Sequence, residues 1–301
     1  TRTAGLTPDD IAALREERER MRTARIERFR ADQRIGLLMH GLARDTDHLL
    51  KKLWKLADMP SDWALFAVGG YGRGELQPAS DVDLLLLAPE PEQARDAATS
   101  APQPSPADSP SADVHDTPPA GASADATTAS PAPALSDDTI AHIERFIGAC
   151  WDIGLEIGHS VRTPAQCAQA AREDITTMTA LLERRQLTGH RRAARQLSEA
   201  MAGQLQLPLF LRDKLLEMRQ RHQKYEDTPY SLEPNCKESP GALRDLQVVA
   251  WISRAAGFGQ AWVSLVRAGV IEPLEASQLQ RYERLLKRIR AWLHILSGRR
   301  E

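Results

Sequence analysis

Apolar residues recur at helical spacing along most of this 301-residue chain. Near its start, Ile35, Leu38, Met39 and Leu42 fall three or four positions apart, the spacing of one buried helical face. Thr7 and Pro8 give the first helix a typical N-terminus. Similar spacing predicts helices over residues 8–57, 139–154, 164–171, 175–188, 191–205, 209–224, 243–255, 260–267 and 274–297.

Three short segments depart from this helical pattern. Residues 64–68 and 84–87 are continuous apolar runs with the length of buried strands. Residues 155–162 alternate between apolar and polar positions, which predicts a half-buried strand with Glu156 on its polar face. We therefore expect an α+β fold in which a small mixed sheet is surrounded by helices.

Residues 89–137 follow neither period. Ten of these 49 residues are proline, and most of the others are Ala, Ser, Thr or Asp. Such a composition cannot bury enough apolar surface to offset the entropy of the chain, so we predict a disordered surface insertion. Eight acidic residues and one basic residue give the segment a charge of −7, which leaves +5 on the rest of the chain.

These patterns predict three parts. Residues 1–57 would form N-terminal helices, and residues 58–163 would form a core that contains the insertion. Residues 164–301 would form a helical domain that completes the functional site. The small net charge of −2 disfavours a dedicated nucleic-acid-binding protein.

The chain has no run of 18 apolar residues and no apolar signal-peptide core at its start. We therefore expect no membrane segment. Its three cysteines, Cys150, Cys167 and Cys236, form no C-x-x-C pair, and their odd number argues against a disulfide framework. This cysteine usage favours a reducing, cytoplasmic location.

Glycines and acidic residues are concentrated between the first two predicted strands. So many glycines indicate a chain that follows a tight path or approaches a ligand closely. Asp81 and Asp83 then lead into the second strand, where alternate residues share one face and lie about 7 Å apart at their α-carbons. The four glycines fall within six residues: Gly69, Gly70, Gly72 and Gly74.

This combination indicates phosphate chemistry. Two neighbouring carboxylates repel each other unless a cation lies between them, and Mg²⁺, or Mn²⁺ in its place, prefers oxygen ligands. Backbone N–H groups in a glycine-rich turn can bind phosphates. Together these features describe a phosphoryl- or nucleotidyl-transfer site. The alternative is a glycine-rich hairpin whose aspartates merely end a strand.

A second polar cluster lies where a predicted loop over residues 230–240 meets the helix at residue 243. It contains Asn235, Lys237, Arg244 and Asp245. Lys237 and Arg244 could neutralise triphosphate oxygens through charge-assisted hydrogen bonds. The alternative is a capping and salt-bridge cluster without a ligand.

The motif GGYGRGEL at residues 69–76, followed by SDVD at 80–83, resembles the signature of the PII-protein uridylyltransferase/uridylyl-removing enzyme family. That family belongs to the DNA polymerase β-like nucleotidyltransferase superfamily. A second block, EPNCKESPGALRD at 233–245, agrees with it. The family usually has two glycines before LRD, whereas this chain has Gly241 and Ala242. The resemblance covers almost all of the chain outside residues 89–137.

The resemblance implies Mg²⁺-dependent transfer of UMP from UTP to a tyrosine of the nitrogen regulatory protein PII, with release of pyrophosphate. Asp81 and Asp83 would hold the metal, and Glu156 would supply the third carboxylate that this fold usually takes from a neighbouring strand. The alternative is a structural role for Glu156, in an ion pair with Arg162 or a helix cation. The nucleotide-binding residues would be Gly69, Gly70, Arg73, Ser80, Asn235, Lys237, Arg244 and Asp245.

The resemblance also implies parts that a 301-residue chain does not accommodate. Family members carry a metal-dependent hydrolase domain and C-terminal ACT domains that sense glutamine, so we expect this chain to be truncated before them. Two other functions stay open. One is a nucleotidyltransferase of the same fold that modifies another acceptor, for example by adenylylation. The other is a nucleotide-binding regulatory module without catalysis.

Overall fold

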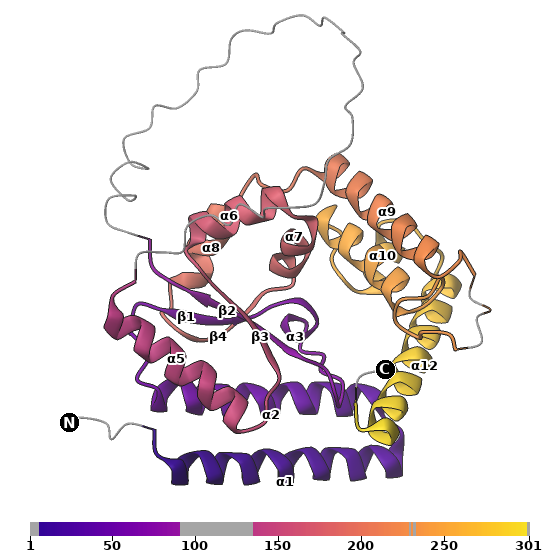
Figure 1. The fold of residues 1–301 in the computed structure, drawn as a ribbon. Coiled ribbons are helices and arrows are strands. Elements are labelled where there is room, and N and C mark those ends of the chain that lie inside the picture. Colours follow the sequence, from indigo (N-terminus) through magenta and orange to yellow (C-terminus); the bar gives the residue numbers. More distant parts are fainter. Residues whose placement is uncertain (1–5, 91–134, 229, 231–232, 300–301) are drawn as a thin grey trace, which may run out of the picture.

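The computed structural model describes residues 6–90, 135–228, 230 and 233–299. A four-stranded sheet in the order β3-β2-β1-β4 lies at its centre. Figure 1 shows α1 and α2 below this sheet, α6 and α8 above it, and α9, α10 and α12 to its right. The mixture of helices around a small mixed sheet confirms the predicted α+β class.

The first helical segment is two helices, α1 (Pro8–Asp32) and α2 (Ile35–Leu56), where the sequence pattern predicted one continuous stretch. The Thr7 hydroxyl accepts the backbone N–H of Asp10, and the Asp10 carboxylate accepts the N–H of Thr7, which forms a capping box. Gln33, with a φ of 56°, ends α1 in the left-handed region. The chain can therefore reverse and pack α2 against α1.

The three predicted strands are present, and their pairing fixes the site. β1 (Ala64–Ala67) is antiparallel to β2 (Val82–Leu87), and β2 is parallel to β3 (Ile157–Arg162). In the second pair, Asp83 lies opposite Gly158. Every residue of β1, and every residue of β2 except Asp83, is buried, which explains the continuous apolar runs in these strands.

Helices pack on both faces of the sheet because alternate strand residues point to opposite sides. Leu65 and Leu84 pack with α1, α2 and α5, whereas Phe66 and Leu85 pack with α6 to α10. The remaining helices are α5 (Asp137–Asp152), α6 (Pro164–Glu173), α7 (Ile175–Leu182), α8 (Ala193–Met201), α9 (Leu207–Lys224), α10 (Leu243–Ala255), α11 (Trp262–Arg267) and α12 (Pro273–Ser297).

The helix predicted over residues 175–188 is wrong in its second half. Helix α7 ends at Leu182, and β4 (Arg185–Gly189) then pairs antiparallel with β1. Only Leu187 of this edge strand is buried, so the strand shows little of the apolar–polar alternation that predicts a strand. A Cβ on Gly189 would lie 2.3 Å from the carbonyl oxygen of Trp63. The strand therefore forms because it pairs closely with a segment more than a hundred residues earlier. The local sequence pattern does not predict this pairing.

The predicted insertion at residues 89–137 lies mostly outside the described residues. Its last residues are described: the Ser136 hydroxyl accepts the N–H of Thr139 and caps α5. Because β4 comes from beyond residue 163, the sheet extends past the predicted core, and the three-part division stays a prediction. No helix in the described part of the chain is both long and apolar enough to cross a membrane.

Candidate active site

A pocket of about 310 Å³ lies between the glycine segment and helices α7, α9, α10 and α12. Asp81 and Asp83 line it together with Gly69, Gly70 and Ser80. Charged side chains dominate its wall. The six cationic residues are Arg73, Lys214, Lys237, Arg244, Lys287 and Arg290, and the five acidic residues are Glu75, Asp81, Asp83, Glu183 and Glu217.

The glycine segment follows the tight path that its composition predicts. Residues Gly69–Gly72 form the single-turn helix α3 directly after β1. Gly69 has a φ of 55°, and a Cβ there would lie 3.4 Å from an Asp83 carboxylate oxygen. At Gly72, a Cβ would lie 2.0 Å from the backbone oxygen of Glu183. Only a residue without a side chain lets this turn lie so close to α7.

The two predicted metal ligands face the same pocket. Asp83 lies beside Gly158, where a Cβ would come within 2.9 Å of its Oδ1. Burial raises the pKa of Asp83 above its ordinary value, and the nearby Lys237 partly offsets this effect. A cation beside this carboxylate would stabilise its ionised form, so the position of Asp83 favours cation binding.

Two carboxylates suit a divalent cation that shares its ligands with a nucleotide. In the described part of the chain, no group of three or more His, Cys, Asp or Glu side chains is placed to hold a metal ion. Phosphate oxygens and water would supply further ligands, as is usual for Mg²⁺. The residues present thus fit Mg²⁺ bound together with a triphosphate.

Glu183 is a site residue that the sequence did not reveal. Its side chain is buried at the end of α7, where it accepts hydrogen bonds from Arg73 at 2.5 Å and from the indole of Trp251 at 2.6 Å. Burial alone would lower the pKa of Arg73, but Glu183 and Glu75 raise it above its ordinary value. Glu183 therefore joins the glycine segment to helix α10.

The C-terminal helix also reaches the glycine segment. Lys287 of α12 contacts Glu75 at 2.6 Å and Glu283 at 2.7 Å. Burial tends to raise the pKa of Glu75, but Lys287 and Arg73 lower it below its ordinary value. A chain of charges therefore runs from Glu183 through Arg73 and Glu75 to α12.

Trp251 is flanked by two cations. The Lys214 ammonium lies 4.6 Å from the centre of its ring, and the Arg244 guanidinium lies 5.4 Å from it. Lys214 is almost fully buried and binds Glu217 at 2.6 Å. Burial lowers the pKa of Lys214, and Glu217 partly restores it. Both cations line the pocket and can approach phosphate oxygens.

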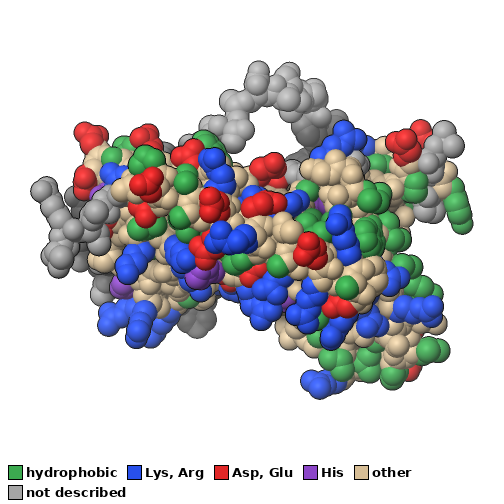
Figure 2. Space-filling view, turned by 90° about the horizontal axis from the view of Figure 1, so that it is seen from below, with side chains coloured by type: hydrophobic (Ala, Val, Ile, Leu, Met, Phe, Trp, Pro, Cys, Tyr) green, Lys and Arg blue, Asp and Glu red, His purple; other side chains and the backbone are tan. Residues whose placement is uncertain are grey.

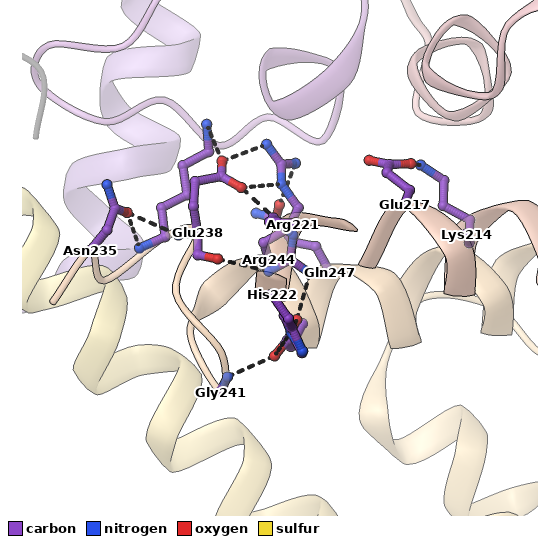
Figure 3. A network of polar contacts seen from close by, with 11 residues as sticks. Lys214, Glu217, Arg221, His222, Asn235, Glu238, Gly241, Arg244 and Gln247 are labelled. Carbon is purple, nitrogen blue, oxygen red and sulfur yellow. Dashed lines mark hydrogen bonds and ion pairs between the residues drawn. The ribbon is translucent and has the colours of Figure 1, made fainter. Parts of the chain in front are cut away.

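The second polar cluster is part of a network of polar contacts (Figure 3), and its four residues divide into two that line the pocket and two that do not. Lys237 and Arg244 line the pocket, and both also pair with Glu238, at 3.1 Å and 3.0 Å. The ligand-binding and the salt-bridge interpretations therefore describe the same two side chains. Glu238 holds these two cations at the pocket wall. A triphosphate bound there could compensate part of their positive charge in place of Glu238.

Asn235 and Asp245 do not line the pocket and instead shape its loop. The Asn235 side-chain oxygen accepts the N–H groups of residues 237 and 238, both at 2.9 Å. Asp245 accepts hydrogen bonds from Arg221 at 2.6 Å, His222 at 3.0 Å and the Gly241 N–H at 2.7 Å. These contacts tie the loop to α9.

Glu156 lies outside this pocket. It is exposed just before β3, where its backbone carbonyl accepts the N–H of Val82 at 2.9 Å. It lines a neighbouring depression with Arg18, and Ser80 lines both hollows. The β3 residue directly beside Asp83 is Gly158. The role of Glu156 as a third carboxylate stays a prediction.

A glycine turn that leads into two carboxylates on a small sheet, beside a wall of cations, is the arrangement that the sequence motifs predicted for nucleotidyl transfer. Residues 49–114 match the nucleotidyltransferase domain family, and residues 209–301 match a family described as GlnD PII-uridylyltransferase. The resemblance inferred from the sequence is thereby confirmed.

Relatives similar to this chain over most of its length bear one name, bifunctional uridylyltransferase/uridylyl-removing enzyme. The protein of Cupriavidus pinatubonensis is 45% identical over 98% of this chain, and that of Bordetella parapertussis is 43% identical over 97%. The protein of Burkholderia vietnamiensis is 46% identical over 92%. The chain spans 29%, 29% and 27% of the length of these three relatives.

Proposed function

We propose that this chain transfers UMP from UTP to a tyrosine hydroxyl of the regulatory protein PII and releases pyrophosphate. The observation that carries the proposal is the convergence of the glycine turn, Asp81, Asp83 and six cations on one pocket. The name of the relatives supports transfer of a uridylyl group, and the description of the matching family supports PII as the acceptor.

The donor would be held at the glycine turn. Gly69 and Gly70 are the first residues of α3, so their N–H groups have no partner within the helix and can bind phosphate oxygens. Asp81 and Asp83 would hold Mg²⁺, or Mn²⁺ in its place. The chemistry that such a cation supplies when bound is neutralisation of phosphate charge.

The transfer step forms one bond and breaks another. The tyrosine oxygen attacks the α-phosphorus in line, and the bond from that phosphorus to the oxygen bridging to the β-phosphorus breaks. Pyrophosphate leaves with the bonding electron pair, and the cations Lys237, Arg244 and Lys287 on the pocket wall stabilise its charge. Glu156 is the proposed acceptor of the phenolic proton, since a tyrosine with a pKa near 10 is protonated at neutral pH.

We further propose that the reaction takes place in the cytoplasm. Cys150, Cys167 and Cys236 are free thiols, and free thiols persist in reducing compartments. Burial raises the pKa of Cys150 and of Cys167 to about 12 each. These two thiols therefore have structural rather than chemical roles.

The direct test measures transfer of label from α-labelled UTP and, separately, α-labelled ATP to purified PII, with and without Mg²⁺. We expect Mg²⁺-dependent labelling of PII from UTP. Labelling from ATP, or of another added protein only, would favour a nucleotidyltransferase with a different acceptor. Nucleotide binding without any transfer would favour a regulatory module. The Asp83→Asn variant gives the background.

A further inference from the structure

A second hollow, which we call the α2–α12 groove, lies between the first half of α2 and the middle of α12. It has a volume of about 1130 Å³ and is larger than the catalytic pocket. Figure 1 shows where the start of α2 lies beside α12, and Figure 2 shows many Lys and Arg side chains on the face of the molecule seen from below. Five exposed arginines line the groove: Arg34, Arg44, Arg281, Arg284 and Arg288.

The charge of the groove is uncompensated. Within the described residues, none of these five arginines has a carboxylate oxygen within the 4.0 Å of an ion pair. The one acidic residue that lines the groove, Asp47, pairs with Arg185 at 2.6 Å and accepts the Tyr71 hydroxyl at 2.6 Å. The arginines are therefore available to an anionic ligand.

The groove shares two walls with the catalytic pocket. On α12, Arg284 and Arg288 line the groove, whereas Lys287 and Arg290 line the pocket. In the glycine segment, Gly74 lines the groove, and the residues on either side of it line the pocket. A molecule held in the groove would therefore lie beside the site where the hydroxyl must react.

The lining favours an acidic protein surface over a nucleic acid. Leu37 and Leu285, which are 37% and 41% exposed, lie between the arginines, so the groove combines cations with apolar area. Arginine matches carboxylates through paired hydrogen bonds. Single-stranded nucleic acids instead stack their bases on aromatic side chains, and the groove lining, all of it described, contains no Phe, Tyr or Trp and has the imidazole of His40 as its one aromatic ring.

We propose that the α2–α12 groove docks an acidic, partly apolar surface of the protein acceptor while the acceptor hydroxyl enters the catalytic pocket. This inference rests on the proposed function, because it assigns the groove to the acceptor of that reaction. It assigns to the arginines recognition of the acceptor and no part in nucleotide binding.

The test is a double charge reversal, Arg284→Glu with Arg288→Glu, at two exposed positions. The matched control is Arg191→Glu with Arg192→Glu, which changes the same charge at the start of α8, outside the groove lining. Steady-state transfer from labelled UTP to PII gives kcat and KM, calorimetry gives the Kd for Mg-UTP, and thermal unfolding gives Tm.

We expect the groove variant to raise the KM for PII at least tenfold. Its kcat, its Kd for Mg-UTP and its Tm should stay within twofold or a few degrees of the parent, like those of the control. The parent KM should rise with salt, and the variant KM should rise less, because screening acts on exposed charges. A KM equal to that of the control would overturn the inference.

Direct binding separates failure of the inference from failure of the proposed function. Binding of PII to the Asp83→Asn protein is measured by sedimentation with and without the two groove substitutions. Binding that the substitutions abolish supports docking even if the parent transfers no UMP to PII. Binding that they leave intact overturns the inference, as does loss of RNA binding alone in a parallel titration with a single-stranded RNA.

Discussion

The candidate active-site pocket and the α2–α12 groove differ in how their cations are paired. Five of the pocket cations pair with a carboxylate: Arg73, Lys214, Lys237, Arg244 and Lys287. The five groove arginines have no such partner within the described residues. Helix α12 contributes side chains to both the pocket and the groove. The difference in pairing therefore arises from what surrounds each of its two faces.

This difference distinguishes cations that are held in position before a ligand binds from cations that recognise a protein partner. A charge that stabilises a transferring phosphate must be held in place before the ligand arrives, because reorganisation during the reaction raises the barrier. Pairing with Glu183, Glu75 and Glu238 provides that order at the pocket. A charge that recruits a protein can stay solvated and unpaired, since its partner brings the compensating group.

The largest expected effect is at the two carboxylates that we propose hold the metal ion. Asp83→Asn should lower transfer by at least about 10³-fold, or about 4 kcal/mol of barrier, because the charge that holds the cation is lost. Radiolabel transfer at saturating UTP measures this loss. Asp62→Asn, at an exposed position, is the control. Near wild-type turnover in Asp83→Asn would remove this residue from the site.

The same variant should be more stable than the parent at neutral pH without metal. Because burial raises the pKa of Asp83, the folded state binds the proton more tightly than the unfolded state. The protonated Asp83 side chain therefore contributes stability that is complete below the ordinary aspartate pKa. This contribution is lost as the pH rises through the raised pKa of the folded state. The Tm difference between variant and parent should therefore grow from pH 3 to pH 7.

The next largest effect is at the buried pair that orders the glycine segment. Glu183→Gln keeps a hydrogen-bond acceptor for Trp251 but leaves Arg73 with only its longer pair to Glu75, at 3.4 Å, at a cost of about 3 kcal/mol. Urea unfolding measures this change, and we expect transfer to fall about 100-fold. Glu199→Gln breaks an exposed pair with Arg195 and should cost less than about 0.5 kcal/mol. Equal losses in the two variants would contradict the positioning role of Glu183.

A smaller effect distinguishes pocket cations from groove cations. Lys237→Ala should raise the Kd for Mg-UTP about 10- to 100-fold, the loss of one charge-assisted contact of about 1.5 to 3 kcal/mol. Arg284→Ala, in the groove, should leave that Kd within twofold. Calorimetric titration compares them. If Lys237→Ala lowers Tm but leaves the Kd unchanged, its pair with Glu238 is structural only.

The smallest expected effect concerns Glu156, which lines neither the pocket nor the groove. Glu156→Gln should lower turnover at least tenfold, or about 1.4 kcal/mol of barrier, if it accepts the phenolic proton. Affinity for UTP should change less. Unchanged turnover with a lower Tm would assign Glu156 to structure, in the depression that it shares with Arg18.

The sequence by itself determined the central part of the fold and half of the site. The apolar runs that became β1 and β2 carry their own pattern, because every residue of these strands except Asp83 is buried. The glycines and Asp83 lie on one continuous stretch, so their proximity follows from local geometry. Helix α10 (Leu243–Ala255) begins and ends where its periodicity predicts.

Only the tertiary structure decided the remainder. Strand β4 has one buried residue, Leu187, and exists through pairing with β1. Glu183 and Lys287 belong to segments rich in charged residues, where no local signal separates a buried partner from a solvated one. Lys287 meets Glu75 across 212 positions of the chain. Periodicity reports which face of an element is buried, but which distant charges share a wall depends on how the elements pack.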